Sequence, residues 1–109
     1  MNSRDCLQVT TTLDSRARAE RLARELVEAR LAACAQVSGP VTSIYHWQGA
    51  VERAEEWYCH FKTTQERVDV LTQAIRERHS YETPEIVTTP LSATDEYGAW
   101  VHRTVNGQE

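Results

Sequence analysis

Two alternating runs of β-forming residues flank a turn signal in the middle of the chain. Residues 41–47 (VTSIYHW) and 51–62 (VERAEEWYCHFK) lie on either side of Gln48-Gly49, and glycine readily takes the positive φ of a tight hairpin turn. At about 3.3 Å per residue, two strands of about ten residues extend about 30 Å. Such a hairpin overhangs a small domain, and an isolated hairpin is marginally stable in water. We therefore expect the overhanging part to pair with another chain.

The segments around the hairpin alternate between strand and helix patterns. Period-two alternation and β-branched residues predict strands at 6–12 and 86–91. Apolar residues at i, i+3 and i+4 predict one helix over 17–31 and another that includes 68–78. A last short helix is expected from residue 94 or 95. The order β-α-β-β-α-β, followed by this trailing helix, predicts a ferredoxin-like α+β sandwich, an antiparallel sheet with the helices on one face.

Short polar side chains mark where the first two helices begin. Asp14 or Ser15 is expected to cap the first helix, because a short side-chain oxygen can accept an unpaired backbone N–H group. Thr63 and Glu66 have the spacing of a capping box at the start of the second helix.

Composition limits the size of the core and the classes of partner. The 109 residues (1–109) are expected to form a single domain. Leu, Ile, Val and Phe supply only 21 of them, so the core is thin and a partner subunit would help. The net charge of −4 argues against a nucleic-acid binder. The sequence has no membrane-length apolar run and begins without the apolar core of a signal peptide, so we expect a cytoplasmic protein without a membrane partner.

The three cysteines favour free thiols rather than disulfides. Cys6, Cys34 and Cys59 are an odd number without a C-x-x-C pair, and nothing in the sequence suggests secretion. Cys59 alternates with Trp57 and Phe61 and is expected in the core. Cys34 is expected to be a small buried hydrophobe, with a redox or soft-metal role as the alternative.

Five blocks together resemble the CutA family of divalent-cation tolerance proteins, from about residue 7 to 101. They are RLAACAQV (30–37), GPVTSIYHWQG (39–49), KTT (62–64), YETPEI (81–86) and EYGAW (96–100). The resemblance implies a homotrimer of ferredoxin-like subunits joined through their hairpins and sheet edges. It also implies a role in the response to copper and other divalent ions, with a PII-like signalling module that binds a small ligand between subunits as the alternative.

The resemblance also suggests candidate metal ligands. In some family members copper is attributed to a Cys on the first strand, one of two adjacent His residues, and the Glu of the following loop. Here the first-strand position is Thr10 and the first of the two His positions is Arg78, which leaves His79 and Glu85. No cofactor is assigned beyond copper or another divalent cation at these residues.

Aromatic and charged residues form a second candidate set for a small-molecule ligand between subunits. Aromatic rings can stack a planar ligand, whereas a lysine and a glutamate can fix its polar groups. The alternative is that the same residues pack the seam of a trimer, where aromatic residues are enriched. The set is Tyr45, Trp47, Lys62, Tyr81 and Glu85.

The sequence does not suggest an enzyme. Nucleophilic catalysis needs a nucleophile within hydrogen-bond reach of an oriented base, and no spacing in this chain indicates such a pair. The arginines of the first helix interleave with Glu20, Glu25 and Glu28, a pattern typical of a salt-bridged, solvated helix face.

Overall fold

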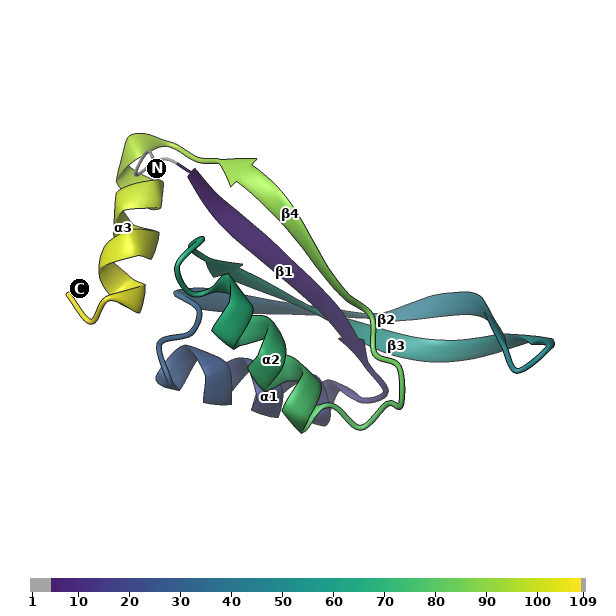
Figure 1. Ribbon diagram of the computed structural model, residues 1–109. Helices are drawn as coiled ribbons and strands as arrows, with labels where there is room; N and C mark the ends of the chain where they lie inside the picture. The colour runs from purple at the N-terminus through teal and green to yellow at the C-terminus, as the bar shows by residue number, and fades with distance from the viewer. Residues whose placement is uncertain (1–4, 109) are drawn as a thin grey trace.

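The computed structural model describes residues 5–108 as four strands and three helices (Figure 1). In chain order these are β1 (Asp5–Leu13), α1 (Arg16–Glu28), β2 (Cys34–Trp47), β3 (Ala50–Thr63), α2 (Val68–Arg78), β4 (Ile86–Ser92) and α3 (Asp95–Val105). The predicted order of elements is confirmed, and the chain is α+β. Within residues 5–108, no helix is long and apolar enough to cross a membrane.

The four strands pair in an antiparallel sheet with the order β2-β3-β1-β4. This is the ferredoxin-like arrangement. β1 and β3 occupy the centre, in a register that runs from Leu7 opposite Thr63 to Leu13 opposite Trp57. β4 lies at an edge, where Pro90 is tolerated because its missing N–H removes no hydrogen bond from an inner ladder.

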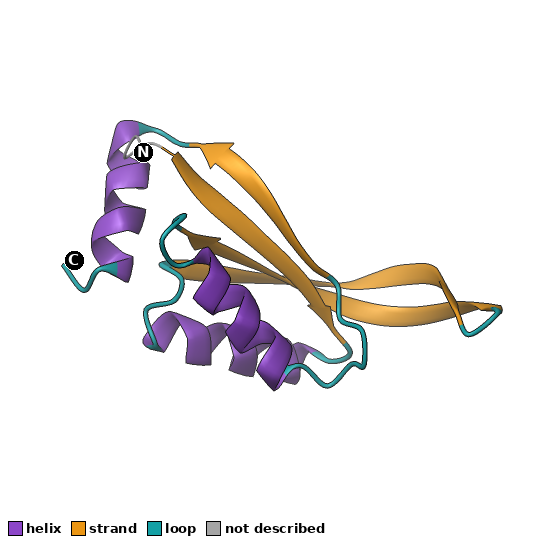
Figure 2. Ribbon diagram, in the orientation of Figure 1, coloured by secondary structure: helices purple, strands orange, loops and turns teal. Residues whose placement is uncertain are grey.

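Helices α1 and α2 lie side by side on one face of the sheet, as predicted (Figure 2). The main core fills the space between these two helices and strands β1 and β3. Its largest fully buried apolar side chains are Val9, Leu26, Phe61, Leu71 and Ile75. Cys59 is also fully buried there, which confirms its expected place in the core.

Helix α3 is an exception to the prediction that the helices share one face. It packs on Cys6, and strand alternation turns the Cys6 side chain away from the face toward which Leu7 and Val9 point. Val101 and Val105 of α3 cover Cys6 in a second, smaller apolar cluster. The sequence prediction missed this cluster because it placed all the helices on one face of the sheet.

The helix starts agree with the prediction in two cases and differ in one. The Ser15 side chain accepts a hydrogen bond from the Arg18 N–H at 3.1 Å, and Thr94 caps α3 in the same way. The capping box predicted at Thr63 and Glu66 is wrong. Thr63 is the last residue of β3, and its buried hydroxyl donates instead to the Leu31 carbonyl at 2.7 Å, so α2 begins only at Val68.

Strands β2 and β3 continue past the sheet as a two-stranded hairpin arm (Figure 1). The paired arm extends from Val41 opposite Glu56 to Trp47 opposite Ala50, beyond a bulge between Ser38 and Val41. The predicted turn is confirmed, since Gln48 and Gly49 both have positive φ, 51° and 84°. The arm makes the subunit elongated, with principal extents of 45 × 23 × 22 Å.

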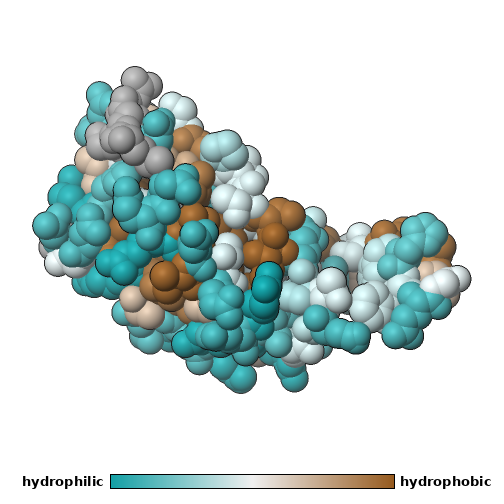
Figure 3. Space-filling model, in the orientation of Figure 1, coloured by the Kyte–Doolittle hydropathy of each residue, from teal (hydrophilic) through white to brown (hydrophobic). Residues whose placement is uncertain are grey.

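The arm exposes apolar side chains far from the core of its own subunit. Figure 3 shows hydrophobic atoms at the far end of the arm. The exposed fractions are 69% for Ile44, 43% for Tyr45, 40% for Trp47 and 64% for Val51. Because a two-stranded ribbon has no second layer to pack against, the described part of the subunit covers these residues only in part.

Candidate functional site

Polar side chains meet where the arm leaves the sheet. The Tyr81 hydroxyl, from the loop between α2 and β4, donates a hydrogen bond of 2.7 Å to Oε2 of Glu56 on β3. Glu56 is only 8% exposed and pairs with Val41, directly after the bulge. The ring of His79 tilts against that of Tyr81, with 4.6 Å between their centroids. We call Glu56, His79 and Tyr81 the arm-base cluster.

Tyr81 acts in this cluster as a hydrogen-bond donor. Burial raises the pKa of Tyr81 well above its usual value, and the hydrogen bond to Glu56 raises it further. The phenol therefore keeps its proton and holds the carboxylate in place. Electrostatic interactions with Glu56, Asp14 and Tyr45 also raise the Tyr81 pKa, so Tyr45 lies within electrostatic reach of the cluster.

Both ring nitrogens of His79 are engaged within the chain. Nε2 donates to the Thr12 carbonyl at 2.8 Å, and Nδ1 accepts from the Tyr81 backbone N–H at 3.1 Å. These two partners fix the tautomer with the proton on Nε2. No lone pair of the ring is left for a metal ion, so coordination by His79 requires the loss of one of these hydrogen bonds.

The predicted ligand residues occupy two ends of the subunit. Trp47 lies at the tip of the arm opposite Ala50, whereas Lys62 lies near the other end of β3, up to roughly 40 Å away at about 3.3 Å per residue. Glu85 is exposed just before β4 and makes no hydrogen bond or ion pair with residues 5–108. Within one chain, the structure thus brings Tyr45 and Tyr81 into one region and leaves Trp47 and Lys62 apart. The sequence analysis predicted that these residues bind a ligand in a cleft shared between subunits, and this stays a prediction.

Lys62 instead belongs to a polar row on the face opposite α1 and α2. Its ammonium donates to Oε1 of Gln36 at 3.3 Å. The neighbouring His60 stacks on Tyr58, and its Nδ1 shares a hydrogen bond of 3.0 Å with the Thr10 hydroxyl. Burial lowers the pKa of His60, and the positive charge of Lys62 lowers it further. The sequence indicated no such hydroxyl–imidazole pair, because Thr10 and His60 are fifty residues apart and meet only through strand pairing.

The cysteines occupy three different environments. Burial raises the pKa of the Cys59 thiol to about 12 and also raises that of Cys6, so both remain protonated at neutral pH. Cys34 is only partly buried, and its sulfur lies 3.4 Å from the Tyr97 hydroxyl, which corrects the prediction of a buried hydrophobe. All three are free thiols, as predicted.

The part of the chain that the structure describes does not supply a closed metal site. Zinc and copper sites in proteins commonly use three or four His, Cys, Asp or Glu ligands. Among residues 5–108, no three such side chains come together in an arrangement that could hold a metal ion. The pair expected from the sequence, His79 and Glu85, is therefore an incomplete set within one subunit.

Comparison with known proteins shows the family. The family model described as CutA1 divalent ion tolerance protein matches residues 7–104, which include the hairpin and the arm-base cluster. The chain belongs to the CutA1 family. Among solved CutA structures, that of CutA from Synechococcus elongatus has a TM-score of 0.89 and 34% identity, and the match covers 96% of this chain and 94% of that one.

Curated CutA relatives extend from bacteria to animals. The divalent-cation tolerance protein CutA of Thermus thermophilus is 38% identical over 94 residues, which cover 85% of this chain and 91% of the relative. Protein CutA of Mus musculus is 38% identical over 86 residues, 78% of this chain and 49% of the relative. The chain thus spans about half the length of the mouse and Arabidopsis thaliana relatives and most of the length of the bacterial one.

Proposed function

We propose that this CutA1-family chain acts in the response to copper and other divalent cations as a homotrimeric, non-enzymatic protein. Support for the cation role comes from the family model and from the bacterial relatives, which are named divalent-cation tolerance proteins. These names refer to tolerance of ions and not to a reaction. The signalling alternative gains no comparable support.

The observation that carries the assembly is the exposed arm. A β-ribbon with Ile44, Trp47 and Val51 at least 40% exposed leaves apolar surface in water and two unpaired strand edges. Pairing with the arms or sheet edges of other copies buries both. Three copies are the number that the resemblance implies.

Light scattering tests the assembly, and we expect a mass near three times 12.4 kDa. Val51→Glu places a charge on the arm and should lower the mass, because the carboxylate would have to lose its hydration in the interface. Val70→Glu is the matched control, since Val70 is similarly exposed (54% against 64% for Val51) but lies on α2. A monomeric wild-type protein, or equal effects of the two substitutions, would refute the assembly.

Calorimetry with copper tests whether the ion binds this protein directly. Coordination at the predicted pair gives saturable binding that is lost in Glu85→Ala and His79→Ala. Because His79 must give up the Thr12 carbonyl or the Tyr81 N–H to bind the ion, copper binding there should also change the thermal stability. Binding that neither substitution changes would exclude these two residues as ligands. A cytoplasmic location is part of the proposal and is checked by cell fractionation.

A further inference from the structure

A small hollow between α1, the end of β1 and the residues after α2 has no part in the proposed function. It has a volume of about 90 Å³ and is lined by three arginines, one glutamate and one serine around two leucines. That volume is far below the roughly 300 Å³ at which pockets for drug-sized ligands begin. Its ligand must therefore be a small ion or a few water molecules.

The charges around the hollow favour an anion. Arg18 and Arg21 come from α1 and Arg78 from the last turn of α2, whereas Glu25 is the only carboxylate of the lining. Arg21 forms no ion pair with any residue between 5 and 108, so its charge is not neutralised by the protein. The lining carries a net charge of about +2 by the ordinary ionisation of these side chains, which falls to about +1 when Asp14, the ion-pair partner of Arg18, is counted.

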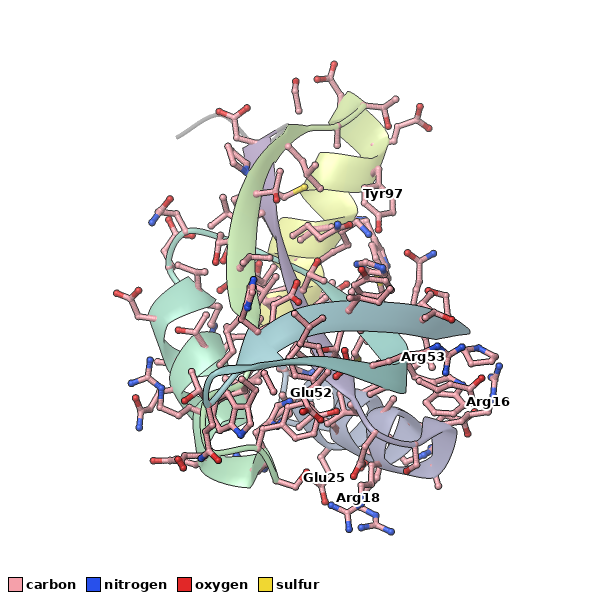
Figure 4. The ribbon with its side chains drawn as sticks, turned by 90° about the vertical axis from the view of Figure 1, so that its right-hand side faces the viewer. Arg16, Arg18, Glu25, Glu52, Arg53 and Tyr97 are labelled. Carbon is pink, nitrogen blue, oxygen red and sulfur yellow. The ribbon has the colours of Figure 1, made fainter. Side chains whose placement is uncertain are left out.

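The other two arginines are only loosely held. Arg18 Nε lies 3.6 Å from Asp14 Oδ1, and Arg78 Nε lies 3.6 Å from Glu25 Oε1. Both contacts are longer than a good charge-assisted hydrogen bond, about 2.7–2.9 Å. Figure 4 shows the Arg18 and Glu25 side chains together at the lower edge of the subunit. Loose pairing leaves N–H groups of both guanidinium groups available to a ligand.

The surroundings of the hollow also suit an oxyanion. Leu13 and Leu22, 3% and 5% exposed, line it with apolar surface, which lowers the local dielectric constant and strengthens charge–charge attraction. Ser80 adds a hydroxyl that can donate a hydrogen bond. The first turn of α1 contains no acidic residue, so its partial positive charge is not compensated by a side chain there.

We propose that this hollow binds a small tetrahedral oxyanion of the phosphate class, held by Arg18, Arg21 and Arg78. The planar guanidinium group matches the oxygens of such an anion in a two-point hydrogen-bond geometry. Glu25 competes with the anion for Arg78, so ligand binding separates the Arg78–Glu25 pair. The lining includes neither predicted cation ligand and no residue of the arm, although Arg78 and Ser80 flank His79 in the chain.

Calorimetry with inorganic phosphate, at an ionic strength kept constant with sodium chloride, tests the site. We expect saturable binding that Arg21→Gln weakens about tenfold or more, because a charge-assisted hydrogen bond is lost. Glu25→Gln should strengthen binding, since it removes the only carboxylate of the lining. Arg24→Gln is the matched control, because Arg24 is on the same helix but pairs with Glu28 outside the hollow, and it should leave the affinity nearly unchanged.

The opposite effects of Arg21→Gln and Glu25→Gln separate a site from general attraction. Equal weakening by Arg21→Gln and Arg24→Gln would show that phosphate responds only to the total charge and would overturn the proposal. A heat signal that does not saturate with phosphate, or that chloride also produces, would likewise overturn the proposal. Acetate in place of phosphate shows whether the site selects a tetrahedral anion, and equal affinity for acetate would refute the phosphate class. Circular dichroism confirms that each variant is folded.

Discussion

Removing the Tyr81 hydroxyl should destabilise the fold, because a buried carboxylate depends on it. Tyr81→Phe keeps the ring, its contact with His79 and the local backbone. It deletes only the 2.7 Å hydrogen bond to Oε2 of Glu56, a residue that is 8% exposed. The Glu56 carboxylate then loses its phenolic donor in a place where water has little access.

The expected loss follows from the cost of leaving a buried acceptor unsatisfied. Such a group costs about 1–3 kcal/mol, and we take about 2 kcal/mol because the acceptor is a carboxylate that keeps a small exposed fraction. For a chain of this size, 1 kcal/mol lowers the melting temperature by about 4 °C, so Tyr81→Phe should lower it by about 8 °C.

Urea unfolding at pH 7, followed by tryptophan fluorescence at one fixed protein concentration, measures this loss. Tyr97→Phe is the matched control, since it makes the same chemical change. Within residues 5–108, the Tyr97 hydroxyl has the Cys34 sulfur as its one hydrogen-bond partner, at 3.4 Å, and Tyr97 is 38% exposed. Its loss should cost no more than about 0.5 kcal/mol, as is usual for surface substitutions.

A double-mutant cycle tests the assigned cause. In a Glu56→Gln background the acceptor is neutral, so Tyr81→Phe should cost less than it does in the wild type. If Tyr81→Phe is no more harmful than Tyr97→Phe, or costs the same with and without the Glu56 charge, the reasoning about the arm-base cluster is refuted.

Three further predictions concern the core, the bulge and pH. Leu71→Ala should lower the free energy of unfolding by about 2–5 kcal/mol, because Leu71 is fully buried. Val70→Ala, on the exposed side of α2, should change it by less than about 0.5 kcal/mol. Thermal melts of the two variants test this difference. In the same thermal melts, Gly39→Ala should destabilise the protein more than Gly49→Ala, although both glycines have positive φ. Of the two, only Gly39 would place a Cβ against a tryptophan ring at 2.8 Å and a backbone oxygen at 3.0 Å. Burial raises the pKa of the Cys59 thiol to about 12, so above pH about 9 the unfolded chain releases this proton first. The contribution of Cys59 to stability should therefore be constant to about pH 8 and fall as the pH rises toward 12. Urea titrations from pH 8 upward that showed no decline would contradict this.

Local patterns predicted most elements of the fold. The Gln48-Gly49 turn and the Ser15 cap both follow from backbone chemistry that involves near neighbours in the chain. The capping box failed because Thr63 has an alternative partner, the Leu31 carbonyl, thirty-two residues away. A spacing rule takes no account of a competing long-range hydrogen bond.

The candidate site was predictable only in part. Tyr81 and His79 were singled out through the loop that carries them, and the structure brings them together. Glu56 was missed because its sequence context, in a charged stretch of β3, is typical of an exposed strand. Its burial depends on the loop from α2 folding over the base of the arm, a contact between segments twenty-five residues apart.

The amino-acid order alone determined the succession of strands and helices and the turn at the tip of the arm, because side-chain alternation and turn chemistry act over a few residues. Only the tertiary structure decided which polar groups meet. It occupied both nitrogens of His79, buried Glu56 under Tyr81 and gathered Arg18, Arg21 and Arg78 around one hollow. The physical reason is that hydrogen bonds and charge–charge attraction act over a few ångströms in space, whatever the separation along the chain.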